Sequence, residues 1–223
     1  MIQHVYERTS KCSLLEKVIV ATDDKRIFKT VKNFNGEVIL TSDKHQSGTD
    51  RCGEVAGYLV NSGMADKNDI LVNIQGDEPF IDPKQIELTI SLFDRKNVCI
   101  ATLARQIKNK SDIFNPNVVK VVFGSQGNAL YFSRQCIPFL ISLEKENWPE
   151  TGVFYEHIGI YAFRINILNE LIKLPVGLLE QNEKLEQLRW LENNYPIHVN
   201  ITSLETYSID IPDDLKKIKQ FLD

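Results

Sequence analysis

Carboxylates that follow a predicted buried strand are the first residues of this sequence that could do chemistry. The most strand-like segment, residues 70–75, runs into Gly76-Asp77-Glu78-Pro79. In open parallel sheets, ligands bind beyond the carboxyl ends of the strands, and Asp77 could there hold Mg²⁺ together with phosphate oxygens. The same residues could instead only turn the chain and cap the next helix, so both interpretations stay open.

A second polar group lies on a strand expected over residues 157–163. Side chains alternate along a strand, so His157, Gly159 and Tyr161 share one face and the isoleucines between them share the other. An imidazole and a phenol separated by a gap could hold a polar ligand. A half-buried strand with a satisfied histidine explains the pattern equally well.

Four further polar residues are candidates for binding. Arg134 follows a predicted hairpin and could pair with an anion through its planar guanidinium, or form only a surface ion pair. Glu186 and Gln187 point about 100° apart on a helix, so at most one is fully solvated if that helix packs on two sides. Asp210 precedes the last predicted helix and could be a second metal ligand.

Alternating strands and helices must position these residues. We expect strands over 17–22, 37–40, 70–75 and 98–102 and helices over about 24–34, 50–62 and from 82 onward, which favours a mostly parallel sheet. A hairpin over 118–133 changes the pattern to antiparallel. Helices are expected over 180–194 and 212–222. The prediction is one α/β domain, residues 1–223, with an antiparallel lobe inserted at about 105–165.

Composition excludes several classes of protein. The chain has 223 residues, 43% hydrophobic and 25% charged, with a net charge of −4. That balance argues against non-specific binding to nucleic acid or anionic membranes, and no apolar run approaches the ~20 residues that span a bilayer. The four cysteines lack disulfide or Cys-x-x-Cys spacing, and the four histidines lack zinc-ligand spacing. We therefore expect free thiols, a reducing compartment and a cytoplasmic location.

Seven motifs occur in one order along the chain: residues 45–51, 72–79, 114–120, 129–134 with 137–138, 157–161, 185–189 and 209–215. Together they closely resemble the 3-deoxy-manno-octulosonate cytidylyltransferase family, the CMP-Kdo synthetases of lipopolysaccharide-making bacteria. The resemblance runs from Met1 to the C-terminus. It implies a Rossmann-like nucleotidyltransferase fold and, by analogy, a homodimer that interacts through the antiparallel segment.

The resemblance also implies a reaction and a set of site residues. The family couples CTP to the sugar acid Kdo, releasing pyrophosphate with the help of Mg²⁺. Asp77 and Asp210 correspond to its metal-binding, catalytic carboxylates. The residues that correspond to its nucleotide contacts are Ser47, Gly48 and Arg51. The residues that correspond to its Kdo pocket are Gln75, Arg134, His157, Tyr161, Glu186 and Gln187.

One departure from the family pattern concerns the start of the chain. The family begins with a strand and a loop of arginine, serine and lysine that grips the CTP triphosphate, whereas residues 1–8 resemble the helix after that loop. We therefore expect a first strand of ~6 residues and its loop to be missing. Two alternatives follow: a catalytically impaired relative that only binds sugar acid or nucleotide, and a cytidylyltransferase for another sugar acid such as sialic acid or 8-amino-Kdo.

Overall fold

The computed structural model describes residues 1–205 and 209. Strands and helices alternate in the first half of the chain, in the order α1 (Ile2–Thr9), β1 (Ile19–Thr22), α2 (Lys25–Asn33), β2 (Glu37–Leu40), α3 (Gly48–Asn61), β3 (Ile70–Asn73), α4 (Pro83–Ile90), η1 (Ser91–Asp94) and β4 (Ile100–Gln106). The second half continues with α5 (Lys110–Phe114), β5 (Lys120–Phe123), β6 (Ala129–Ser133), η2 (Lys145–Thr151), β7 (Tyr155–Arg164), α6 (Ile165–Leu171), α7 (Leu178–Glu183), α8 (Gln187–Glu192) and β8 (Ile197–Thr202).

The strands form two sheets. β1 and β2 make a parallel pair, and a six-stranded sheet has the order β6-β5-β7-β4-β8, with β3 also paired to β7. β4 and β8 are parallel, whereas β7 runs antiparallel to β3, β4 and β5. The predicted α/β fold is confirmed, but the larger sheet is mixed rather than mostly parallel. The physical reason is that β7 follows the hairpin lobe and not a helical crossover, so it enters the sheet from the opposite direction.

A bulge in β7 shapes the polar face of this strand. Thr102 pairs with Tyr161, but the next residue of β4, Leu103, pairs with Ile158. Gly159 therefore lies in the irregular stretch of β7 and is exposed, while its neighbours are buried. Bulges of this kind re-aim side chains and are common beside functional sites.

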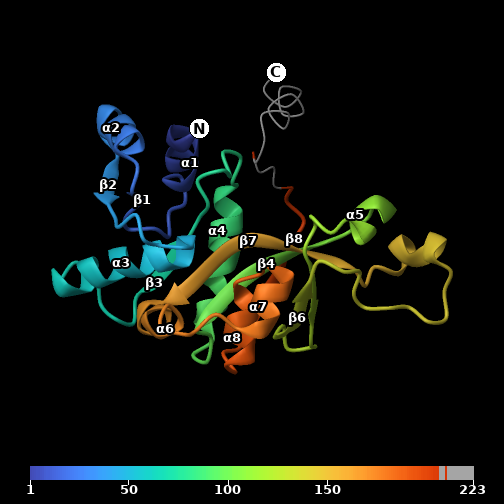
Figure 1. Cartoon of the computed structure of the whole chain (residues 1–223). Coiled ribbons are helices and arrows are strands. Elements are labelled where there is room, and N and C mark those ends of the chain that lie inside the picture. The colour runs from blue at the N-terminus through green and yellow to red at the C-terminus, as the bar shows by residue number, and fades with distance from the viewer. Residues whose placement is uncertain (206–208, 210–223) are drawn as a thin grey trace, which may run out of the picture.

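Helices cover both faces of the larger sheet (Figure 1). On one face, Ile86 of α4 packs with Leu103 and Ile158. On the other, Phe163 and Trp190 are in edge contact within a core that includes residues from α3, α6 and α8. Fully burying one such side chain contributes roughly 1.5–3 kcal/mol, so the two cores fix β7 and β4 at the centre of the molecule.

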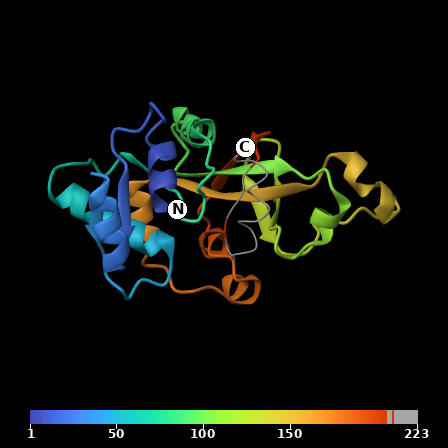
Figure 2. The same cartoon turned by 90° about the horizontal axis from the view of Figure 1, so that it is seen from above.

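The two ends of the molecule have different architectures (Figure 2). β1, β2, α1 and α2 lie at one end. The β5–β6 hairpin, α5 and η2 lie at the other, where Ile107, Ile113, Trp148 and Phe154 form a separate small core. Within the described part of the chain, none of the helices is long and apolar enough to cross a membrane. All four cysteines are free thiols, as predicted, and Cys12 is buried.

The region predicted as one helix over residues 180–194 is instead two short helices, α7 and α8. α7 ends because Lys184 adopts the left-handed conformation, with φ of 53°. Arg189 of α8 then donates two hydrogen bonds to the Glu180 carboxylate of α7, at 2.7 and 2.6 Å, which fixes the angle between the helices. The helix predicted over 212–222 lies outside the described residues.

Candidate active site

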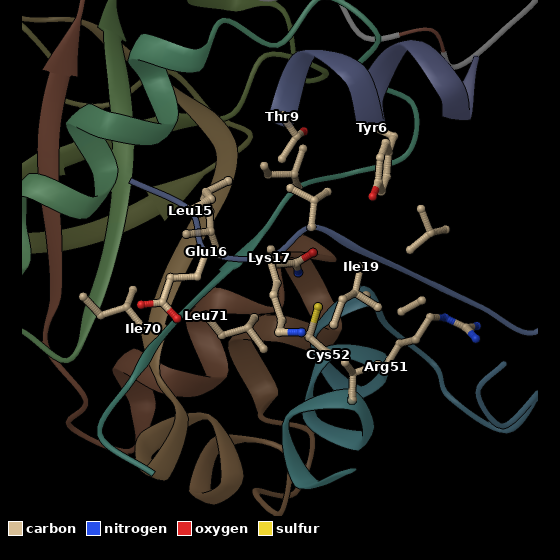
Figure 3. Close-up of a pocket in the computed structure, with 18 of the residues that line it drawn as sticks. Tyr6, Thr9, Leu15, Glu16, Lys17, Ile19, Arg51, Cys52, Ile70 and Leu71 are labelled. Carbon is tan, nitrogen blue, oxygen red and sulfur yellow. The ribbon is translucent and has the colours of Figure 1, made fainter. Parts of the chain in front are cut away.

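A cavity of about 570 Å³ lies between β1 and β3, with α1 on one side and α3 on the other (Figure 3). Its walls include Ile19 and Leu71 of the two strands and Val5 of α1. Where β3 ends, the lining becomes polar at Asn73 and Gln75. The predicted site residues Gly48, Arg51 and Gln75 therefore border this cavity, whereas His157, Tyr161 and Glu186 are not among the residues that line it.

The N-terminus of α3 is anchored beside the end of β3. Ser47 is the N-cap, and its hydroxyl accepts a hydrogen bond from the Asp50 backbone N–H at 3.1 Å. A side chain at Gly48 would place its Cβ 3.3 Å from the amide nitrogen of Gln75 and 3.5 Å from that of Asn73. Glycine thus allows the predicted nucleotide loop to approach the predicted sugar-side residue Gln75 closely.

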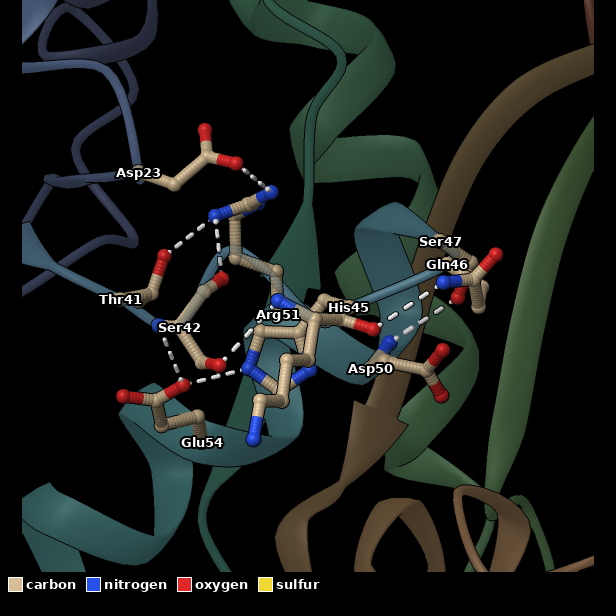
Figure 4. A network of polar contacts seen from close by, with 10 residues as sticks. Asp23, Thr41, Ser42, His45, Gln46, Ser47, Asp50, Arg51 and Glu54 are labelled. Atoms are coloured by element: carbon tan, nitrogen blue, oxygen red, sulfur yellow. Dashed lines mark hydrogen bonds and ion pairs between the residues drawn. The ribbon is translucent and has the colours of Figure 1, made fainter.

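Arg51 connects α3 to the ends of β1 and β2 (Figure 4). Its guanidinium forms an ion pair with Asp23 at 3.2 Å and donates hydrogen bonds to the Thr41 hydroxyl and the Ser42 carbonyl. In the same network Glu54 accepts the Ser42 N–H at 3.0 Å and contacts His45. These bonds lower the pKa of Glu54. Arg51 therefore has a structural function in this state, whatever ligand it contacts.

Glu186 joins the nucleotide side and the sugar side of the predicted site. The Ser47 hydroxyl donates to one of its carboxylate oxygens at 2.9 Å, and the Thr49 hydroxyl donates to the other at 2.7 Å. Burial raises the pKa of Glu186, and the two hydroxyls oppose that rise. Burial, and then the charge of Glu186, hold the pKa of Tyr161 well above its usual value.

His157 and Tyr161 lie on one face of β7, as predicted, with ring centroids 5.2 Å apart. The Thr102 hydroxyl and Nε2 of His157 are 3.0 Å apart, and Phe132 contacts the imidazole edge-on. Burial lowers the pKa of His157 to about 3, so the ring is neutral near pH 7. Among the described residues, no group completes a hydrogen bond to the buried Tyr161 hydroxyl.

Arg134 is half-buried, and within the described part of the chain its guanidinium donates to main-chain carbonyls rather than to a carboxylate. Its Nε donates to the Glu183 carbonyl at 2.7 Å, and its Nη1 donates to the Pro116 carbonyl at 3.1 Å. Gln187 is buried at the first position of α8, and Glu186 is half-buried before it. Arg134 therefore holds the α7–α8 turn next to the pocket, and its contact with an anion stays a prediction.

Asp77 lies in the loop after β3, as predicted, and it is half-buried. Its backbone carbonyl accepts a hydrogen bond from the Ile209 N–H at 2.9 Å, which brings the chain that leads into residue 210 beside it. Asp210 itself lies outside the described residues. Within the described ranges, no group of three His, Cys, Asp or Glu residues could hold a metal ion. Metal binding by Asp77 and Asp210 stays a prediction.

Sequence reasoning missed Thr49 and Thr102, the two hydroxyls that contact Glu186 and His157. Thr49 is part of the Ser-Gly-Thr-Asp-Arg sequence, and this was the available signal. No sequence signal pointed to Thr102, because its contact with His157 depends on how β4 pairs with β7.

A low-identity match fits this architecture. The solved structure of 4-diphosphocytidyl-2C-methyl-D-erythritol synthase superposes with a TM-score of 0.62 at 11% identity, covering 100% of this chain and 88% of that one. That match shows the α/β fold alone, and the class, a nucleotidyltransferase, comes from a family comparison. A family model described as "Cytidylyltransferase" matches residues 1–218. The chain belongs to the 3-deoxy-manno-octulosonate cytidylyltransferase family.

Relatives with this name match along the whole chain. The protein of Parabacteroides distasonis is 46% identical over 226 residues, covering 100% of this chain and 87% of the relative. The protein of Thermodesulfovibrio yellowstonii is 44% identical over 223 residues, covering 100% of this chain and 88% of the relative. The structure of CMP:2-keto-3-deoxy-manno-octonic acid synthetase complexed with CTP superposes with a TM-score of 0.87 at 36% identity. The match covers 99% of this chain and 86% of that one. These matches give no support to the expectation that a first strand and loop are missing.

Proposed function

We propose that this protein transfers the CMP group of CTP to Kdo, forming CMP-Kdo and pyrophosphate for lipopolysaccharide biosynthesis. The observation that carries the proposal is the contact of Ser47 and Thr49 with Glu186, which joins the predicted CTP side to the predicted Kdo side. Sequence identity of 46% to a relative named for this reaction supports it.

The chemistry calls for positioning and charge stabilisation more than for a covalent intermediate on the protein. The anomeric hydroxyl oxygen of Kdo attacks the α-phosphorus of CTP and forms a P–O bond while its proton passes to solvent. The bond to pyrophosphate breaks, and pyrophosphate leaves. The N-terminus of α3, which begins at Gly48, is suited to face phosphate oxygens. Arg134, His157 and Tyr161 would bind the sugar acid. The low pKa of His157 makes it a neutral hydrogen-bonding group near pH 7.

Mg²⁺ is the metal that this reaction class implies, and the residues present fit it in chemical type. Asp77 and Asp210 would supply carboxylate oxygens, the ligands that Mg²⁺ prefers. The Ile209–Asp77 backbone hydrogen bond keeps the two segments together. When bound, the metal would neutralise phosphate charge.

Release of pyrophosphate tests the reaction. We expect release only when CTP, Kdo and Mg²⁺ are all present, and slower release with sialic acid or 8-amino-Kdo as acceptor. Binding of CTP or Kdo without turnover would instead indicate the impaired relative. Equal or faster rates with another sugar acid would overturn the Kdo assignment.

Asp77→Asn tests the metal assignment. Because removal of one group that stabilises transition-state charge commonly costs about 10²–10³ in rate, we expect a loss of that size. Asp94→Asn, at an exposed position in η1, is the matched control and should retain activity. An Asp77→Asn rate within a few-fold of the parent protein would refute the assignment.

We also infer a homodimer and a cytoplasmic location. Large apolar side chains are exposed between β6 and η2, at Phe139, Ile141 and Leu143. Exposed apolar patches commonly mark protein interfaces, and this one lies in the antiparallel lobe. Four free thiols suit a reducing compartment.

A further inference from the structure

Thr49 is buried rather than exposed at the surface of the candidate site. Only 3% of its surface is accessible, and its hydroxyl is 2.7 Å from Oε2 of Glu186. A side chain this buried cannot contact a substrate to any useful extent. The Thr49 hydroxyl can therefore affect a bound ligand only indirectly, through its hydrogen bond to Glu186.

The two hydroxyls fix the orientation of the Glu186 carboxylate. Ser47 donates to Oε1 and Thr49 donates to Oε2, so rotation of the carboxylate group breaks at least one hydrogen bond. Each carboxylate oxygen has further lone pairs that these bonds leave available. Glu186 is half-buried, so part of this residue remains accessible from outside the core.

The backbone that carries Glu186 is held from the other side. Arg134 donates to the carbonyls of Glu183 and Lys184, at 2.7 and 3.4 Å, and Leu185 is buried. The short turn before α8 is thus fixed independently of α3. Ser47 and Thr49 therefore fix only the orientation of the Glu186 side chain, not the position of its backbone.

We propose that Thr49 is a positioning residue of the sugar-acid pocket: with Ser47, it orients the Glu186 carboxylate so that it accepts a hydrogen bond from a sugar hydroxyl. This inference rests on the proposed function. Because Ser47 is also the N-cap of α3, the segment that faces the nucleotide orients the group that faces the sugar.

Three variants test the role. Thr49→Val removes the hydroxyl and keeps the β-branched shape, Thr49→Ser restores the hydroxyl, and Thr89→Val removes a buried hydroxyl from α4 as the control. Hydrogen bonds to charged groups are worth about 1.5–3 kcal/mol, so we expect Thr49→Val to raise KM for Kdo about tenfold to a hundredfold. KM for CTP should change by less than about threefold, and Thr49→Ser should recover most of the effect.

A double-mutant comparison separates positioning from general stability. In a Glu186→Ala background, which removes the acceptor of the Thr49 hydroxyl, Thr49→Val should add less than about threefold to KM for Kdo, because its action passes through the carboxylate. An equal effect in both backgrounds would overturn the inference, as would equal rises in KM for CTP and Kdo. If Thr49→Val does not fold, Thr49→Ala replaces it in the same comparison.

Failure of this inference is distinguishable from failure of the proposed function. If the unmodified chain releases no pyrophosphate from CTP and Kdo, the proposed function fails and the inference fails with it. If the unmodified chain is active and Thr49→Val leaves KM for Kdo unchanged, only the positioning role is wrong.

Discussion

The charge state of His157 depends on the fold. The imidazole contacts the Thr102 hydroxyl and the ring of Phe132, and burial lowers its pKa to about 3 from a reference value of 6.5. A neutral imidazole can donate at one nitrogen and accept at the other, whereas an imidazolium can only donate. This site therefore keeps an acceptor available that a solvated histidine would lose in mild acid.

The lowered pKa predicts a pH-dependent stability. Between about pH 6.5 and pH 3 the unfolded chain binds a proton at His157 that the folded chain does not, so stability is full above pH 6.5 and falls as the pH is lowered. The loss should approach about 1.4 kcal/mol per pH unit. In His157→Gln the free energy of unfolding should fall less steeply from pH 6.5 to about pH 4.5.

Urea unfolding at a series of pH values measures this difference. His4→Gln, at an exposed position on α1, is the control and should follow the parent curve. Parallel curves for His157→Gln and the parent protein would show that His157 titrates alike in both states.

At the scale of elements, Lys120 joins the two strands of the hairpin. It is fully buried at the start of β5, and its ammonium donates to the carbonyls of Asn115, Val118 and Arg134. Burial lowers the pKa of this lysine. Two of the carbonyls belong to the turn before β5 and the third to Arg134, directly after β6. The Lys120 side chain therefore connects the start of the hairpin to its end.

Replacing Lys120 by methionine should therefore destabilise the lobe. The variant leaves carbonyls without their donor, and we expect the free energy of unfolding to fall by about 2 to 4 kcal/mol. Lys108→Met, at an exposed position after β4, should change it by less than about 0.5 kcal/mol. Urea denaturation measures both, and equal effects would contradict the assigned role.

The elements also show what could be predicted from the sequence. The β-branched runs of β1, β2 and β3 and the N-caps Asp24 and Asp82 are local signals, and the predicted strands and helices there were correct within a few residues. β8 was not predicted, because its burial comes from pairing with β4. The α7–α8 break depends on the conformation of Lys184, which no local signal indicated.

The candidate site shows the same division between local and tertiary information. The polar ends of the strands and the shared face of His157 and Tyr161 were predictable from order and alternation. The Glu186–Thr49 contact joins residues 137 positions apart, and the position of α8 depends on how the core packs.

At the scale of the whole molecule, exposed apolar side chains gather in the antiparallel lobe, through which we propose that the homodimer pairs. Ile141 is 90% exposed and Phe139 is 69% exposed, in a segment that passes over Trp148 and its small core. Apolar surface of this kind favours burial against another surface, and a closed homodimer buries the same patch on both subunits. The β1–β3 cavity is lined mainly by α1, β1, α3 and β3, which lie away from the lobe, so pairing through the lobe would leave that cavity open.

Ile141→Asp should therefore convert the proposed dimer into a monomer, because a carboxylate buried without a partner opposes association. Sedimentation velocity should show a shift from about twice the chain mass of 25.6 kDa to the chain mass itself. Leu178→Asp, a change at a residue 70% exposed on α7, is the matched control and should leave the dimer intact. If Leu178→Asp dissociates the dimer and Ile141→Asp does not, the interface includes α7 and the lobe is free.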